Sequence, residues 1–258
     1  MAFNIPDNAA LLQGRLALVT GAASGIGRAI AWGYAQQGAR VVMTDLAEPG
    51  CQDTVAEIRH AGGEAWAFGL DVCDDEACRA VAERVGAEIG DIDVLVNSAG
   101  ILIREGIDSP QAHAALRRVV DVNLFGCFNT IHAFLPALRR TRGSIINIAS
   151  GAAFIAQAGC VGYSSSKAAL KMLTETMAVD LAADGIRVNA LAPGVIETPM
   201  TAATRSDPAR LAAFMRRTPM GRVGQPDELA GPAIFLASAM ASYVNGVTLP
   251  VDGGTLAT

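Results

Sequence analysis

The sequence has 258 residues, of which 51% are hydrophobic and 17% charged, so one large buried core is feasible and a disordered chain is excluded. The net charge is −5 and no long run of Lys or Arg occurs, which argues against nucleic acid or an anionic membrane as a partner. The first 13 residues lack a basic region followed by an apolar one, and no apolar run could span a bilayer, so we expect a cytoplasmic protein with an N-terminal tail over 1–13.

Seven short apolar runs along the chain are typical of β-strands. Two of them, 16–19 and 145–148, are almost continuous in apolar residues, as a strand buried on both faces of a parallel sheet requires. The predicted strands are 15–20, 40–44, 64–70, 94–97, 144–149, 187–191 and 247–251.

Longer stretches with helical periodicity lie between these strands. Gly38 and Gly62 follow two of them, where a helix C-terminal cap favours glycine. The alternation predicts an α/β fold, with one doubly wound parallel sheet of about seven strands, helices on both faces and a single domain over 1–258. The least regular stretch, 197–224, is expected to be a mobile substrate loop with a short helix. The predicted helices are 25–37, 52–61, 75–89, 112–139, 162–183 and 227–237.

The first strand runs directly into a glycine-rich turn, Thr20-Gly21-Ala22-Ala23-Ser24-Gly25-Ile26-Gly27, and then into a helix. Glycines at such a turn let the backbone approach a pyrophosphate, and the helix N-terminus offers free N–H groups to the phosphates. The spacing is G-x3-G-x-G rather than the commoner G-x-G-x-x-G, but its position between strand and helix favours a dinucleotide site over a tight turn alone.

Asp45 ends the second strand, 18 residues after Gly27. An acidic side chain there is expected to accept hydrogen bonds from the adenosine ribose hydroxyls and to repel a 2′-phosphate. Neither Ser24 nor Leu46, which flank that position, is basic. The sequence therefore predicts NAD rather than NADP as the cofactor, the alternative being that Asp45 only starts a turn.

Tyr163 and Lys167 lie four residues apart on a predicted helix and so share one face. A phenol has a reference pKa near 10, and a nearby ammonium is expected to lower it, so the pair forms a credible acid–base centre. By itself Y-x3-K is a frequent chance pattern on helices.

Polar residues at the ends of other strands strengthen this assignment. Ser150 follows the predicted strand 144–149, at the carboxyl edge where open α/β sheets bind ligands, and could polarise a carbonyl. Asn97 ends another strand at the same edge. Asn123 is a polar residue in an apolar helical pattern and needs hydrogen-bond partners, which could be helix backbone or a water linked to Lys167.

Taken in order, these motifs resemble those of the short-chain dehydrogenase/reductase family, in its short single-domain branch, which has a Rossmann-like fold. Ser98 is a small departure, because the family more often has a second Asn there. The matching residues are Thr20-Gly21-x3-Gly25-Ile26-Gly27, Asp71-Val72, Asn97-Ser98-Ala99-Gly100, Asn123, Ser150, Tyr163-x3-Lys167, Pro193-Gly194-x3-Thr198 and Val251-Asp252-Gly253-Gly254.

The resemblance implies a role for each of these residues. Tyr163 would exchange a proton with the substrate oxygen, Ser150 would orient that oxygen, and Lys167 would lower the pKa of Tyr163 and bind the nicotinamide ribose. Asn123 would support a proton-relay water and complete a catalytic tetrad. The implied cofactor contacts are Gly21, Ser24, Ile26 and Gly27 (phosphates), Asp45 (adenosine ribose), Asp71 and Val72 (adenine), Asn97, Ala99 and Gly100 (adjoining ribose region), Tyr163 and Lys167 (nicotinamide ribose) and Pro193, Gly194, Ile196 and Thr198 (nicotinamide).

The leading hypothesis is an oxidoreductase that transfers a hydride between NAD(H) and a secondary alcohol or ketone, with polyols and sugars among the candidate substrates. A 3-oxoacyl-carrier-protein reductase is an alternative that Asp45 disfavours. A catalytically silent cofactor-binding sensor or scaffold would be expected to lack part of the tetrad, and a sugar-nucleotide epimerase or dehydratase would need a longer chain. Residues expected to face the substrate are Gly151, Ala152, Gln157, Cys160, Val195 and part of 200–217.

The cysteines and histidines do not predict a metal site. The five cysteines are odd in number and form no CxxC, and no histidine stands at ligand spacing from them, so free thiols in a reducing compartment are expected. The resemblance also implies a homotetramer with 222 symmetry, formed by pairing the long helices 112–139 and 162–183 and by the apolar end of the chain. The cysteines are Cys51, Cys73, Cys78, Cys127 and Cys160.

Overall fold

The computed structural model describes residues 10–258, so the first nine residues of the predicted tail lie outside the described residues. The rest of that tail packs against the domain. Leu12 is buried, and its N–H donates to the carbonyl of Gln37 at 3.0 Å. Leu12 therefore belongs to a hydrophobic core and fixes the end of this segment to the domain.

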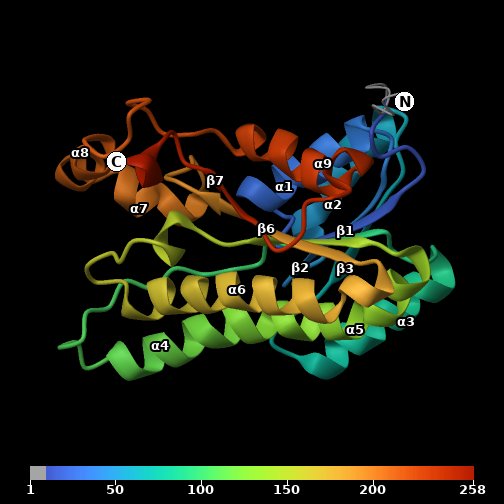
Figure 1. Cartoon of the computed structure of the whole chain (residues 1–258), viewed down its shortest axis with the longest axis horizontal. Coiled ribbons are helices and arrows are strands. Elements are labelled where there is room, and N and C mark those ends of the chain that lie inside the picture. Colours follow the sequence, from blue (N-terminus) through green and yellow to red (C-terminus); the bar gives the residue numbers. More distant parts are fainter. Residues whose placement is uncertain (1–9) are drawn as a thin grey trace.

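A single sheet of seven parallel strands forms the centre of the molecule (Figure 1), as the sequence predicts. Its order is β3-β2-β1-β4-β5-β6-β7. Each strand begins and ends within two residues of its predicted limits. The strands are β1 (Leu16–Thr20), β2 (Arg40–Asp45), β3 (Ala65–Gly69), β4 (Val94–Asn97), β5 (Ser144–Ile148), β6 (Arg187–Pro193) and β7 (Thr248–Val251).

Helices cover both faces of the sheet (Figure 1). Strand β1 shows why its sequence is continuously apolar: Ala17 and Val19 belong to one hydrophobic core, and Leu16 and Leu18 to the other. One face carries α1 (Gly25–Gln36), α2 (Pro49–His60) and α9 (Ala230–Ala237); the other carries α3 (Asp75–Glu88), α4 (Ala112–Val120), α5 (Gly126–Thr141) and α6 (Val161–Asp180).

The predicted long helix over 112–139 is not one α-helix. A π-helical turn, Asp121–Phe125, separates α4 from α5. Asn123 lies in this turn, and its side chain binds both the N–H and the carbonyl of Ile101. A tertiary contact of this kind, which spacing along the helix cannot predict, accompanies the local change of helical pitch.

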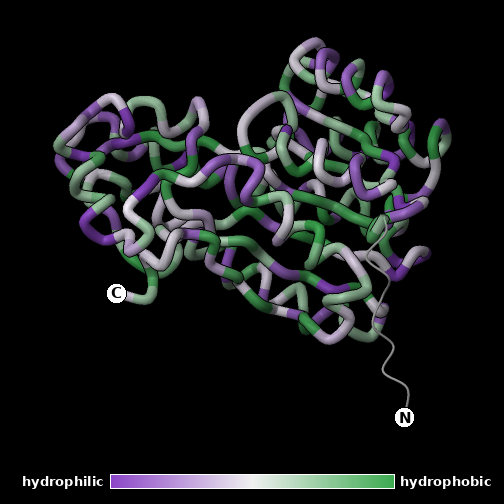
Figure 2. Tube along the Cα trace, turned by 90° about the horizontal axis from the view of Figure 1, so that it is seen from above, coloured by the Kyte–Doolittle hydropathy of each residue, from purple (hydrophilic) through white to green (hydrophobic). Residues whose placement is uncertain are grey.

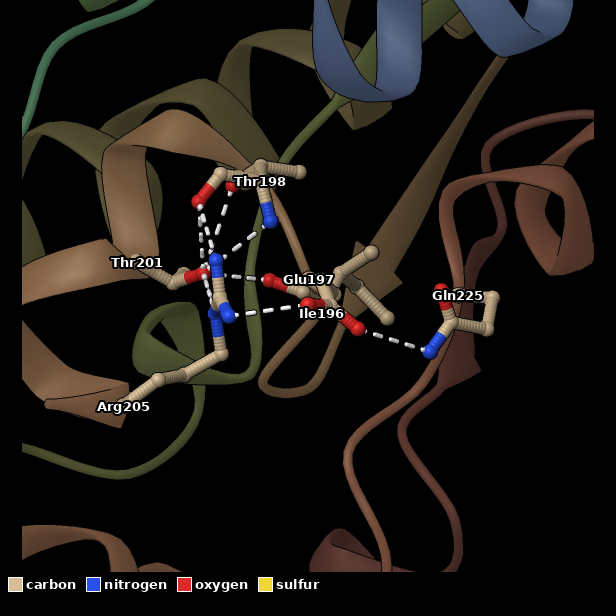
Figure 3. A network of polar contacts seen from close by, with 6 residues as sticks. All are labelled: Ile196, Glu197, Thr198, Thr201, Arg205 and Gln225. Atoms are coloured by element: carbon tan, nitrogen blue, oxygen red, sulfur yellow. Dashed lines mark hydrogen bonds and ion pairs between the residues drawn. The ribbon is translucent and has the colours of Figure 1, made fainter.

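The stretch predicted as a loop with one short helix contains a 3-10 turn, Pro199–Thr201, and two α-helices, α7 (Ala202–Arg205) and α8 (Pro208–Met215). Seen from above, this segment forms one end of the molecule next to the C-terminus and mixes hydrophilic with hydrophobic residues (Figure 2). Its start is anchored: Arg205 Nη1 lies 2.9 Å from Glu197 Oε1, and Gln225 Nε2 donates to Glu197 Oε2 at 3.0 Å (Figure 3). The mobility of the segment stays a prediction.

Candidate active site

A cleft opens at the carboxyl ends of β1 and β4, where the strand order reverses. Open α/β sheets bind ligands at such a switch point. Thr20 joins the two strand ends, because its Oγ1 accepts hydrogen bonds from the N–H groups of Ser98 and Ala99, both at 3.1 Å. The cavity measures about 300 Å³ and extends from Asp71 to Thr198.

The glycine-rich turn forms one wall of the cleft and leaves no room for side chains. Gly21 has a φ of +63°, and a Cβ there would lie 2.8 Å from the backbone of Ala99. A Cβ on Gly27 would lie 2.3 Å from the Gly21 carbonyl oxygen. Ser24 precedes α1 without capping it through its side chain, so the N–H groups at the helix start remain available to a phosphate.

Asp45 lines the cleft beside this turn. One carboxylate oxygen accepts from the Ala23 N–H at 3.0 Å and the other from the Leu46 N–H at 2.8 Å. A carboxylate oxygen can accept a second hydrogen bond, so Asp45 closes the turn and still has capacity for ribose hydroxyls.

The adenine end of the predicted site also lines the cleft. Asp71 Oδ1 accepts from the Cys73 N–H at 2.9 Å, and Val72 packs beside it with 7% of its surface exposed. Leu70 and Arg118 complete this end and were missed by the motif analysis. Arg118 lies on α4, and no sequence pattern near Asp71 predicts that the two residues line the same cleft.

Asn97 does not line the cleft, in contrast to the prediction. Its Nδ2 donates to Asn147 Oδ1 at 2.9 Å and its Oδ1 accepts from Thr130 at 2.6 Å, so both polar ends are used inside the protein. Asn147 in turn donates to Thr174 on α6. Asn97 therefore ties β4 to β5 and α5, and the neighbouring residues Ser98, Ala99 and Gly100 face the cavity instead.

Ser150, Tyr163 and Lys167 converge on the floor of the cleft, as predicted. Lys167 is buried; its Nζ donates to the Ile148 carbonyl at 2.7 Å and lies 5.9 Å from the centre of the Tyr163 ring. The Ser150 Oγ accepts from the Ala152 N–H at 3.1 Å, which orients the hydroxyl next to the phenol.

The pKa of Tyr163 differs from the sequence-based expectation. Burial raises it above the ordinary phenol value, while the hydrogen-bonding Ser150 hydroxyl and, more weakly, the charge of Arg104 lower it. Burial also lowers the pKa of Lys167, because a charged ammonium loses its hydration. Protein burial thus favours the neutral phenol, the form that can donate a proton.

Asn123 reaches the same region from the π-helical turn. Its Oδ1 accepts from the Ile101 N–H at 2.8 Å, and its Nδ2 donates to the Ile101 carbonyl at 3.0 Å and to Ser166 Oγ at 3.1 Å. A Cβ on Gly100 would lie 3.2 Å from Asn123 Oδ1 and 3.6 Å from Lys167 Nζ. The side chain therefore positions the end of β4 and the start of α6 relative to one another.

The opposite wall of the cleft follows β6 and comprises the predicted residues Pro193, Gly194, Ile196 and Thr198. This wall approaches the glycine-rich turn closely, because a Cβ on Gly25 would lie 3.1 Å from Thr198 Cγ2. Thr201 donates to the Ile196 carbonyl and accepts from the Thr198 N–H, which fixes the wall (Figure 3). All predicted cofactor contacts except Asn97 thus surround one cavity.

A second, smaller cavity of about 100 Å³ adjoins the first at Ser150 and Tyr163. Of the residues expected to face the substrate, Gly151, Gln157 and Val195 line it, whereas Ala152 and Cys160 are buried and do not line it. Its remaining lining residues were not all foreseen: Leu102, Arg104, Ile155, Pro193, Gly194, Met200, Thr201, Thr204, Phe214, Arg217, Asp252, Thr255 and Leu256.

Two further features concern residues 10–258 as a whole. Within this range no three His, Cys, Asp or Glu side chains come together as metal ligands could. No helix in the described part of the chain combines the length and the apolar character that crossing a membrane takes.

Comparisons with known proteins agree with this geometry. The family model described as enoyl-(acyl carrier protein) reductase matches residues 21–255. A cis-4-hydroxycyclohexanecarboxylate dehydrogenase of Sinomonas cyclohexanicum is 42% identical, with 93% of this chain and 96% of the relative aligned. The 3-oxoacyl-[acyl-carrier-protein] reductase of Thermotoga maritima is 40% identical over 94% of this chain and 98% of its own length.

Solved structures show the same fold. A gluconate 5-dehydrogenase from Burkholderia cenocepacia, in complex with NADP and tartrate, is 39% identical and superposes with a TM-score of 0.93, covering 97% of this chain and 98% of that one. The Rossmann-like sheet, the cleft at its switch point and full-length similarity to dehydrogenases and reductases lead to one conclusion. The chain belongs to the short-chain dehydrogenase/reductase family, oxidoreductases that act on CH–OH groups.

Proposed function

We propose that this chain interconverts a secondary alcohol and a ketone with NAD(H), and that a polyol or sugar derivative is its substrate. The observation that carries the proposal is the meeting of two cavities at Ser150 and Tyr163. A dinucleotide in the larger cavity and a carbonyl compound in the smaller one would share those two side chains. The bound nicotinamide would supply or accept the hydride.

The protein's own residues would handle the proton and the geometry. In reduction Tyr163 Oη would give its proton to the substrate oxygen, and in oxidation it would take the proton from the hydroxyl. Ser150 would hold that oxygen by a hydrogen bond. Lys167 would bind the nicotinamide ribose and favour the ionised phenol. Asn123, whose two side-chain N–H groups both donate hydrogen bonds, would act by holding the Ile101 peptide and α6 in place.

The cofactor preference rests on Asp45. Its carboxylate lies where the adenosine ribose is expected, and Leu46 beside it is exposed and uncharged. A 2′-phosphate there would meet like charge without a basic partner. The Burkholderia structure contains NADP. We propose that this chain prefers NAD(H), because its own turn is closed by a carboxylate.

Several relatives act on ring or sugar-acid alcohols by their names, such as the hydroxycyclohexanecarboxylate and gluconate dehydrogenases. An acyl-carrier-protein reductase is also among them. The small second cavity favours a compact alcohol over a long acyl chain.

Assembly and compartment remain part of the proposal. Four exposed apolar side chains lie on the two helical segments expected to pair, as a helix-pairing interface of a homotetramer would need. They are Phe125 at the end of the π-helical turn, Phe128 at the start of α5, and Met172 and Val179 on α6. All five cysteines are free, which suits a reducing cytoplasm. A monomeric mass by light scattering would contradict the tetramer.

The test is a spectrophotometric screen of secondary alcohols and ketones at the absorbance of reduced nicotinamide, run in parallel with NAD(H) and NADP(H). We expect turnover with at least one polyol or sugar derivative, and a higher kcat/KM for NAD(H). Tighter binding of NADPH than of NADH would contradict the role assigned to Asp45. Binding of NADH without any turnover would favour a silent scaffold instead.

A further inference from the structure

Arg104 places a positive charge in the small cavity next to Tyr163. Apolar side chains otherwise dominate this part of the cavity, among them Leu102, Ile155 and Phe214. Arg104 follows β4, and its neighbour Glu105 forms an isolated parallel bridge with Cys160, which fixes the local backbone. A guanidinium in such surroundings usually has an anionic partner.

The guanidinium is held by neutral groups. Arg104 Nη1 lies 3.1 Å from the sulfur of Cys160, and Nη2 donates to Thr204 Oγ1 at 2.9 Å. Both acceptors are buried, and burial raises the pKa of the Cys160 thiol, so it stays uncharged. These two contacts fix the direction of the guanidinium and use two of its five N–H donors.

No carboxylate in the described part of the chain forms an ion pair with Arg104. Across residues 10–258 the ion pairs of arginines involve other side chains, for example Arg205 with Glu197 and Arg210 with Asp207, and none involves Arg104. Its charge is therefore compensated by no acidic side chain at ion-pair distance.

One carboxylate, Asp252, lines the same cavity, but its oxygens point into the C-terminal turn and form no ion pair with Arg104. They accept from the Gly254 N–H at 2.9 Å and from the Leu256 N–H at 2.8 Å, within the C-terminal turn. Arg217 adds a second positive charge to the lining from an exposed position. Two cations thus line the cavity with a single carboxylate, and neither Arg104 nor Arg217 lies at ion-pair distance from it.

From this arrangement we infer that Arg104 binds a carboxylate of the substrate, so that the enzyme acts on hydroxy- and oxo-carboxylates rather than on neutral alcohols. The remaining N–H donors of a guanidinium can bind a carboxylate in a bidentate manner. The cavity is small, so one compact molecule could reach Tyr163 with its carbonyl and Arg104 with its carboxylate. This inference rests on the proposed function and narrows it to one substrate class.

The experiment compares a hydroxycarboxylate with its primary carboxamide, which has nearly the same shape and no charge. The pairs are 4-hydroxycyclohexanecarboxylate with its carboxamide and gluconate with gluconamide. We expect the unmodified enzyme to show the higher kcat/KM for the carboxylate. In Arg104→Gln the ratio of the two kcat/KM values should fall roughly 10- to 100-fold, as for the loss of a hydrogen bond to a charged group.

Two further variants separate binding from structure. Arg104→Lys keeps the charge and should retain part of the ratio, even if Arg104→Gln folds poorly. Arg216→Gln removes a cation next to Arg217 that does not line the cavity, and should leave the ratio unchanged. Thermal unfolding and NADH binding check that each variant is folded.

An unchanged ratio in a folded Arg104→Gln enzyme would overturn the inference and leave Arg104 as a tie between Cys160 and Thr204. A preference of the unmodified enzyme for the carboxamide would overturn it as well, while the proposed function would stand. If neither charged nor neutral alcohols and ketones react with either nicotinamide cofactor, the proposed function fails and the inference fails with it.

Discussion

The larger and the smaller cavity of this active site are built in different ways. The larger one is formed mainly by short segments at the carboxyl ends of consecutive strands, where backbone groups and glycines determine the shape. The smaller one is assembled from side chains of separate segments: 102–104, 150–163, 193–204, 214–217 and 252–256. Under the proposed function, cofactor binding would therefore depend mainly on local chain geometry, and substrate choice on tertiary packing.

In the proposed mechanism the chemistry takes place at the boundary between the two cavities, so the largest effect is expected there. Tyr163→Phe keeps the ring and its packing but removes the hydroxyl. We expect kcat to fall by ~10²–10⁴, the usual contribution of a general acid–base group, with nearly unchanged NADH affinity. Steady-state kinetics and a fluorescence titration with NADH measure the two quantities. Retention of most of the activity would leave Tyr163 as a packing residue only.

Gly27→Ala tests the backbone-built cavity. The added Cβ would lie 2.3 Å from the Gly21 carbonyl oxygen, so the turn or the start of α1 must shift. We expect a loss of stability of about 1–3 kcal/mol, as for other overpacked sites, together with weaker NADH binding. The matched control is Gly86→Ala on α3, where a Cβ meets nothing within 4 Å and should be tolerated. Chemical denaturation and NADH titration distinguish the two variants, and equal behaviour would contradict the close-packing argument.

Exchanging charge at the ribose end tests cofactor choice. Asp45→Ala combined with Leu46→Arg removes the carboxylate and supplies a partner for a 2′-phosphate. We expect the ratio of kcat/KM for NADPH to that for NADH to rise roughly 10- to 100-fold, the range for hydrogen bonds to charged groups. Leu46→Arg alone should give a smaller change, because Asp45 remains. If the unmodified enzyme already prefers NADPH, Asp45 does not determine the choice between the two cofactors.

The titration of Tyr163 tests how strongly burial raises the pKa of this phenol, which lines both cavities. Because burial raises its pKa, the cofactor-free enzyme should ionise this phenol only above the ordinary value of 10.0. Ultraviolet difference titration of the enzyme against Tyr163→Phe measures this. The neutral form stabilises the fold below about pH 10, and that contribution is lost as the pH rises through the raised pKa. Ser150→Ala should raise the pKa of Tyr163 further, because the Ser150 hydroxyl lowers it. A midpoint below 10 in the unmodified enzyme would instead support the expectation from the sequence that Lys167 lowers this pKa.

The smallest effect is expected at the ion pair between Arg222 and Glu228, which lies at the end of the stretch 197–224. Glu228 accepts from Arg222 at 2.7 and 2.8 Å and from the Gln225 N–H at 2.7 Å, and these bonds lower the pKa of its carboxyl to about 2. Its contribution to stability is present above the ordinary pKa of 4.5 and is lost as the pH falls toward about 2. Glu228→Gln should therefore weaken the acid dependence of the melting temperature slightly. Because both side chains of the pair are exposed, high salt should screen the pair, and the variant and the unmodified protein should then show the same pH dependence.

The sequence by itself determined the fold and most of the larger cavity. A strand that is buried on both faces of the sheet is continuously apolar, and a helix that is buried on one face has apolar residues at helical spacing. Both patterns can be recognised in the sequence without a structure. The glycine-rich turn, Asp45, Ser150 and the Tyr163–Lys167 pair could be placed because each follows a strand or shares a helix face. Their positions depend on spacing over a few residues.

Tertiary structure decided what local spacing cannot express. Asn97 ends β4 and Ser150 follows the end of β5, so local spacing makes them look alike, yet Asn97 is buried because Asn147 and Thr130 bind its side chain. Arg104 enters the smaller cavity because Cys160 and Thr204, 56 and 100 residues away, hold its guanidinium. The C-terminal turn, which contains Asp252 and Leu256, lines the same cavity because it follows β7, the strand that pairs with β6. These contacts join distant segments, and their energies depend on burial and hydrogen-bond partners that only the folded chain brings together.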